Sequence, residues 1–119
     1  MTEWPDIRIS ISKPDLFEAF KIQLKKDFDN CGVNPDFMGK MIPEFDFILK
    51  LLSEEIKKII KNSNEKLREL LYRIDINELQ IKKLSQQNPE ASFEVIIAEL
   101  IIKRELQKVV IKQFYKNNE

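Results

Sequence analysis

Apolar side chains recur every three or four residues along most of this chain, which is the spacing of one face of an α-helix. The first such stripe predicts a helix over residues 14 to 31. Pro14 suits a first helical turn, and Gly32 suits the position after a last turn. The stripe itself contains Leu16, Phe17, Phe20, Leu24, Phe28 and Cys31.

A second apolar stripe runs from residue 44 to residue 74 without a change of phase. Ser63 interrupts its spacing, and Asn62 with Glu65 has the arrangement of a capping box, which would start a new helix. Because the phase matches on both sides of Ser63, one kinked helix is the favoured interpretation, and two helices are the alternative.

The C-terminal third of the chain predicts a short helix and then a long one. The short helix starts at Asp75 or at Asn77, and the long one opens at Asn88 or at Ser92. Residues 93 to 102 are apolar on nearly every side. A helix that is apolar all round is buried all round, so this segment is expected at the centre of the bundle or against a partner chain.

The N-terminal segment shows a different period. Residues 5 to 13 alternate apolar and polar side chains, which predicts a strand with Ile7, Ile9 and Ile11 on one face. The backbone of a lone strand needs a hydrogen-bonding partner. The segment is therefore expected either to lie across the helices as an extended arm or to pair with the same segment of a second copy, and these isoleucines are the candidate self-association residues.

Together the patterns predict a mostly α fold, an elongated bundle of four to five helices with a short N-terminal strand or extended arm. The chain has 119 residues, which fits a single domain over 1–119, with the arm in 1–13 and the bundle in 14–119.

Two further stretches each allow two interpretations. Phe37, Met38 and Met41 either close one end of the bundle or form an exposed patch for a partner.

The second stretch is a basic ridge of four residues spaced by four on the last predicted helix. It is either a solvated helix face or a binding surface for an acidic protein or for phosphate. The ridge consists of Arg104, Lys108, Lys112 and Lys116.

Composition removes most enzyme classes. The chain has no His and two Gly, so it can hold neither a His-dependent relay or zinc site nor a glycine-rich nucleotide loop. We therefore expect no enzyme, no cofactor and no metal. Residues 27–32 match three positions of a calcium loop, but Met38 stands where the loop needs a bidentate Glu, and Asp27 is better explained as part of a hydrated helix end. A pocket containing a carboxylate with a strongly raised pKa would revive the enzyme hypothesis.

Charge and cysteine content suggest the setting. The 20 basic and 20 acidic residues balance, which argues against a general nucleic-acid or membrane-surface protein. No apolar run reaches the ~20 residues that a bilayer requires. The single Cys31 and the absence of a signal-peptide pattern favour a cytoplasmic protein.

The N-terminal 42 residues also carry a resemblance. The order of a strand (IRISIS), a helix opened by Pro (PDLFEAF), a Gly turn (CGVN) and a second helix (PDFMGKMI) is similar to the ribbon-helix-helix class of dimeric DNA-binding proteins. The resemblance implies that Arg8, Ser10 and Ser12 enter the major groove from a two-chain ribbon.

Two functions follow from these patterns. The first is a small cytoplasmic helical protein that acts by protein–protein contact as an adaptor, regulatory subunit or assembly component and that self-associates. The second is the ribbon-helix-helix-like DNA-binding protein, and nucleic acid is a partner only under this second hypothesis.

Overall fold

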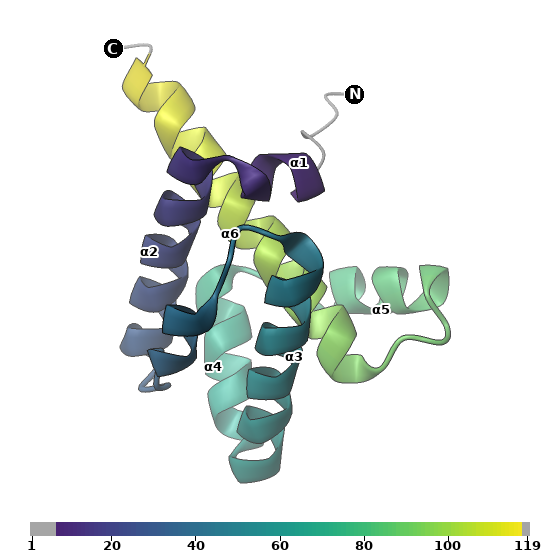
Figure 1. Ribbon diagram of the computed structural model, residues 1–119. Coiled ribbons are helices and arrows are strands. Elements are labelled where there is room, and N and C mark those ends of the chain that lie inside the picture. The colour runs from purple at the N-terminus through teal and green to yellow at the C-terminus, as the bar shows by residue number, and fades with distance from the viewer. Residues whose placement is uncertain (1–6, 118–119) are drawn as a thin grey trace.

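The computed structural model describes the backbone of residues 7–117 and the side chains of residues 7–113 (Figure 1). This part of the chain is helical and contains no strand, which confirms the mostly α prediction. The predicted count of four to five helices is wrong, because the described residues form six α-helices: the N-terminal segment is helical and residues 45–74 form two helices. The described elements are α1 (Ile7–Ser12), α2 (Pro14–Asn30), the short 3₁₀ helix η1 (Asp36–Lys40), α3 (Phe45–Asn62), α4 (Asn64–Ile74), α5 (Glu78–Gln87) and α6 (Phe93–Asn117).

Helix α6 is the centre of the fold, because it packs against each of the other five α-helices (Figure 1). Its apolar first half supplies several fully buried side chains, and the chain covers them with its own helices. One copy thus buries most of this apolar segment, whereas Phe93 at its start remains 48% exposed. The buried α6 residues include Ile96, Ile97, Ala98, Ile101 and Ile102.

Helix α2 has the bounds that its sequence predicts to within one residue. Pro14 occupies its first turn, and Gly32 follows its C-cap with a φ of 70°. The Val33 amide donates to the Phe28 carbonyl at 2.9 Å, and the Gly32 amide donates to the Asp29 carbonyl at 3.1 Å. This is the Schellman arrangement, in which a residue in the left-handed region lets the chain turn away from the helix.

The segment from residue 44 to residue 74 forms two helices, so the favoured interpretation of one kinked helix is wrong. Ser63 has an extended backbone, with φ −165° and ψ 110°, and its Oγ accepts a hydrogen bond from the Lys66 amide at 3.3 Å. Helix α4 turns back beside α3 (Figure 1). The apolar phase matches across Ser63 because both helices face the same core.

The N-terminal strand prediction is also wrong, since residues 7–12 form helix α1. In a helix, Ile7 and Ile11 lie one turn apart on the same face, whereas Ile9 lies on the opposite face. Ile11 is accordingly buried and Ile9 is 60% exposed. Contacts with the core override the alternating pattern, so the three isoleucines do not share a surface.

Residues 33–44 close the bundle between α2 and α3. Phe37, Met38 and Met41 are buried, and the rings of Phe28 and Phe37 lie 5.4 Å apart. These side chains belong to the core of this copy, and no exposed patch is formed by them.

Helix α5 stands apart from the rest of the bundle, beside the start of α6 (Figure 1). It begins with the capping box that the sequence allows, since Asn77 and Gln80 each accept a hydrogen bond from the other's backbone amide. None of its residues is buried, and Leu79 is 72% exposed. Ile81 is partly buried against the core, and α5 is attached to the bundle through such contacts.

The molecule is mildly elongated, with extents of 43 × 32 × 24 Å. Within the described residues, no helix combines the length and the apolar character needed to cross a membrane.

Candidate functional site

A cluster of charged side chains lies inside the bundle, where α2 meets the second half of α6. Two carboxyl groups form its centre. Asp27 of α2 is 2% exposed, and Glu105 of α6 is 0% exposed. Buried carboxyl groups are rare in proteins unless they are paired, so these two need counter-charges.

Three side chains that carry N–H groups contact Asp27. Lys108 Nζ lies 3.3 Å from Asp27 Oδ2, and Arg73 Nε lies 3.3 Å from Asp27 Oδ1. Gln23 Nε2 donates a hydrogen bond to Asp27 Oδ2 at 3.2 Å. Burial alone would raise the pKa of Asp27, but the neighbouring Glu105 carboxyl, the Gln23 amide and the Lys108 charge outweigh it and lower the pKa. Asp27 is therefore the ionised member of the pair.

Glu105 has the opposite environment. Its Oε1 lies 3.3 Å from Lys108 Nζ, but neither carboxyl oxygen accepts a hydrogen bond from the described part of the chain. Burial raises the pKa of Glu105 to about 8, and the negative charge of Asp27 acts in the same direction. Glu105 therefore holds a proton at neutral pH, and one ionised and one neutral carboxyl share the cations around them.

The location of this pair decides what it can do. A carboxyl that holds a proton near neutrality could serve as a general acid, but only within reach of a substrate. Glu105 has no exposed surface, so no substrate can contact it. The geometry therefore makes the cluster a bridge between α2, α4 and α6.

The predicted basic ridge on α6 faces this bridge and the end of α4. Arg104 Nη2 lies 3.1 Å from Asp75 Oδ2, and Lys112 Nζ donates to Gln23 Oε1 at 2.6 Å. Lys108 is held by the carboxyl pair, and the side chain of Lys116 lies outside the described residues. The spacing of the ridge was visible in the sequence, whereas the pairing of Arg104 with Asp75 and of Lys108 with Asp27 joins α6 to residues far away in the chain.

Asp27 was expected at a hydrated helix end, and the structure instead buries it against α4 and α6. The expectation was wrong because α6 supplies Lys108 to the carboxylate from 81 positions away in the sequence. Cys31, one turn further along, is free and buried, and burial raises the pKa of its thiol. Among the described residues, no group of three or more acidic or thiol side chains is arranged to hold a metal ion.

The proposed DNA-contacting residues do not form one surface in the described helix α1. Arg8 Nη1 lies 3.0 Å from Asp46 Oδ1, and its guanidinium lies over the Phe45 ring at 4.6 Å. Ser10 is buried, and the Ser12 hydroxyl donates to the Ile9 carbonyl. The ribbon strand on which the resemblance depends is thus a helix that packs on the bundle.

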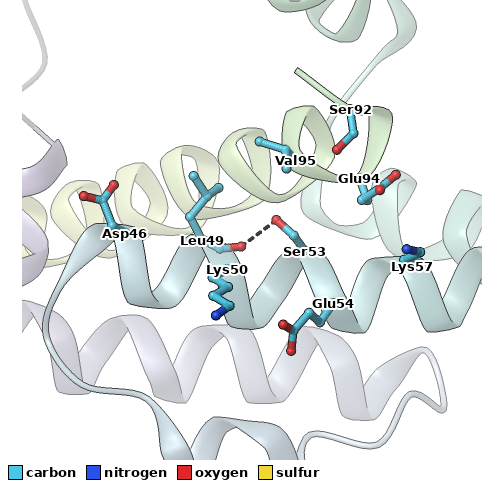
Figure 2. Close-up of a pocket in the computed structure, with 9 residues that line it drawn as sticks. All are labelled: Asp46, Leu49, Lys50, Ser53, Glu54, Lys57, Ser92, Glu94 and Val95. Carbon is cyan, nitrogen blue, oxygen red and sulfur yellow. Dashed lines mark hydrogen bonds between the residues drawn. The ribbon is translucent and has the colours of Figure 1, made fainter. Parts of the chain in front are cut away.

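A groove of about 380 Å³ opens at the surface between α3 and the start of α6. Leu49, Ser53 and Val95 point between the two helices, whereas in this view Lys50 and Glu54 point to the side of α3 that faces away from α6 (Figure 2). The Ser53 hydroxyl donates to the Leu49 carbonyl, so this polar group is satisfied within α3. The residues that line the groove are Asp46, Leu49, Lys50, Ser53, Glu54 and Lys57 of α3, with Ser92 just before α6 and Glu94 and Val95 in its first turn.

Sequence reasoning missed this groove. Its α3 residues recur at helical spacing, which is visible in the sequence, but the wall supplied by α6 cannot be inferred from that spacing. Comparison of the chain with protein-family models, with curated proteins and with solved structures gave no match.

Proposed function

We propose that this protein is a small cytoplasmic adaptor, regulatory subunit or assembly component that acts by protein–protein contact through the groove between α3 and α6. The observation that carries the proposal is the composition of that groove. Its floor is apolar at Leu49 and Val95, and its edges are charged. An apolar floor with polar edges is the composition used by proteins that bind a helix in a groove.

The occupant that fits is an amphipathic helix. The lining residues of α3 extend from Asp46 to Lys57, which is about 16 Å at ~1.5 Å per residue. That length accommodates three turns of a second helix. Such a helix would place apolar side chains over the floor and charged ones along the edges.

The buried cluster supports the same proposal indirectly. Asp27 and Glu105, whose pKa values are lowered and raised respectively, lie inside the bundle and bridge its helices. The exposed charges at the groove are left for contact with another molecule. The proposed activity therefore depends on the shape and charge of a surface.

The experiment is site-specific photocrosslinking followed by a binding measurement. A benzophenone side chain replaces Lys57, which lines the groove, or Lys25, which is exposed on α2 and serves as the control. The crosslinked protein, whether a second copy or another chain, is then purified and its affinity for the wild type is measured.

We expect crosslinks from position 57 in excess over position 25. We also expect Ser92→Trp, which fills the groove from an exposed position, to weaken binding at least tenfold, with no change for Lys25→Trp. Equal crosslinking from both positions, or full affinity in the Ser92→Trp variant, would show that the groove is not the docking surface.

A further inference from the structure

The charged residues along helix α3 are arranged so that they would pair with those of a second α3 running in the opposite direction. Along the groove its charged residues alternate in sign, from Asp46 through Lys50 and Glu54 to Lys57. Read from the other end, the signs alternate in the opposite sense. Two copies of α3 laid antiparallel therefore place unlike charges opposite each other, whereas parallel copies place like charges opposite each other.

These charges are available for a partner. In the part of the chain that the structure describes, Lys50, Glu54 and Lys57 form no ion pair or hydrogen bond through their side chains. The neighbouring residues Glu55 and Lys58 on the same helix do pair, with Lys58 Nζ 3.2 Å from Glu55 Oε1. Asp46 contacts Arg8, and its side chain is still 64% exposed.

The middle of the stripe allows close approach. The pairs Asp46 with Lys57 and Lys50 with Glu54 both centre near residue 52. Ser53 is the groove residue next to that centre, and its hydroxyl is turned back onto its own helix. Small side chains at a helix crossing let two backbones come close, as in other helix pairs. The two-fold axis would thus pass where the surface is hollow.

We propose that the helix received by the groove is α3 of a second copy, antiparallel across a two-fold axis, with Asp46 opposite Lys57 and Lys50 opposite Glu54 of the second copy. This inference rests on the proposed function and specifies its partner. Because a two-fold operator repeats each contact, the interface contains four unlike-charge pairs over the apolar floor. Exposed pairs contribute little individually, so the dimer is a weak one that salt dissociates.

The test uses two charge reversals at exposed positions of the full chain. Lys50→Glu places two glutamates opposite two glutamates in the homodimer, and Glu54→Lys places lysines opposite lysines. Mixing the two variants restores unlike pairs at every contact. Sedimentation velocity between 5 and 500 µM protein, in 50 mM and 500 mM salt, measures the mass of each sample.

We expect a wild-type dimer at 50 mM salt that dissociates at 500 mM. We expect each single variant to dimerise at least tenfold more weakly, and their 1:1 mixture to form a heterodimer. The matched control is Lys25→Glu on α2, which has the same net charge as Lys50→Glu but changes a residue outside the groove. A mixture of Lys25→Glu with Glu54→Lys should form no such heterodimer.

Each alternative result has a distinct meaning. A wild type that stays monomeric at 500 µM in low salt overturns the self-pairing, and the crosslinking experiment then still decides the proposed function. A wild-type dimer that is unaffected by either reversal shows self-association through a different face and also overturns it. Heterodimers formed equally by the Lys25→Glu control would show attraction by net charge alone.

Discussion

The buried cluster around Asp27 and the exposed stripe of α3 contain the same kinds of residue in opposite environments. In the cluster, the cations and the carboxyl groups come from three different helices, and each cation lies 3.3 Å from a carboxyl oxygen. In the stripe, Lys50, Glu54 and Lys57 have no ionic partner in the described part of the chain. The cluster holds helices together, and the stripe presents charge to solvent.

The difference shows that burial, and not residue type, determines the use of a charge here. Inside the bundle the low dielectric makes an unpaired charge expensive, so α2, α4 and α6 are locked in the one arrangement that pairs Asp27 and neutralises Glu105. At the surface, water screens the charges of α3, and they have little effect on the fold. They remain available to choose a partner and its orientation.

The largest expected effect comes from removing the ionised member of the cluster. Asp27→Ala leaves Gln23 and Arg73 without their acceptor and is expected to lower the free energy of unfolding by about 2–4 kcal/mol. Lys108 still contacts Glu105, which limits the loss. Urea unfolding at pH 7 measures the change. Asp29→Ala, two residues along the same helix and half exposed, is the control and should change the value by less than ~0.5 kcal/mol.

A smaller effect is expected from the proton on Glu105. Its pKa rises from 4.5 in a free glutamate to about 8 in the folded chain, so folding takes up a proton between these pH values. The stabilisation is complete below pH 4.5 and declines as pH rises through 8, by at most ~1.4 kcal/mol per pH unit. Asp27 acts in the opposite sense, because its lowered pKa stabilises the fold above pH 3.8 and this is lost in acid.

Glu105→Gln tests this proton directly, because the amide copies the neutral carboxyl and cannot ionise. Thermal and urea unfolding from pH 5 to pH 8 should show a declining stability in the wild type and a nearly flat one in the variant. The variant should be more stable at pH 8 by about 1–3 kcal/mol. The control Glu99→Gln, on the same helix, should show the same decline of stability with pH as the wild type. If Glu105→Gln also showed the wild-type decline, Glu105 would be ionised in the folded chain.

The smallest effect is expected at the stripe. Lys50→Ala and Glu54→Ala remove exposed side chains that have no ionic partner within the described chain, so each should change the free energy of unfolding by less than ~0.5 kcal/mol. The measurement is made at 5 µM protein, where a weak dimer is dissociated. A loss above ~1 kcal/mol would mean that these charges stabilise the monomer.

Local features of the fold were predictable because their causes are local. Pro14 and Gly32 fix the ends of α2, and Asn77 with Gln80 fixes the start of α5. The largely apolar start of α6 correctly indicated the central helix. At these helix ends a residue acts on backbone groups within a few positions, and the apolar character of α6 is contained in one segment, so this information is present in a short window of sequence.

The errors arose where distant contacts decide the outcome. Ile11 is drawn into the core, so the alternating segment folds as a helix, and Ser63 ends α3 because α4 must turn back onto the same core. The bridge between Asp27 and Lys108 and the wall that α6 gives to the groove depend on helices far apart in sequence. Hydrophobic spacing indicates which face of a helix is buried but not which helix covers it.

The central claim is that the buried charge cluster stabilises the fold, whereas the exposed charges of α3 bind a second copy. Amide hydrogen exchange at two protein concentrations tests this claim most directly. Between 5 and 500 µM, exchange should slow in residues 46–57 of α3 as the dimer forms, because the partner suppresses local opening. Exchange in residues 23–27 and 104–108 should be slow and equal at both concentrations. Concentration-independent exchange in α3, or slowing confined to the cluster, would contradict the account.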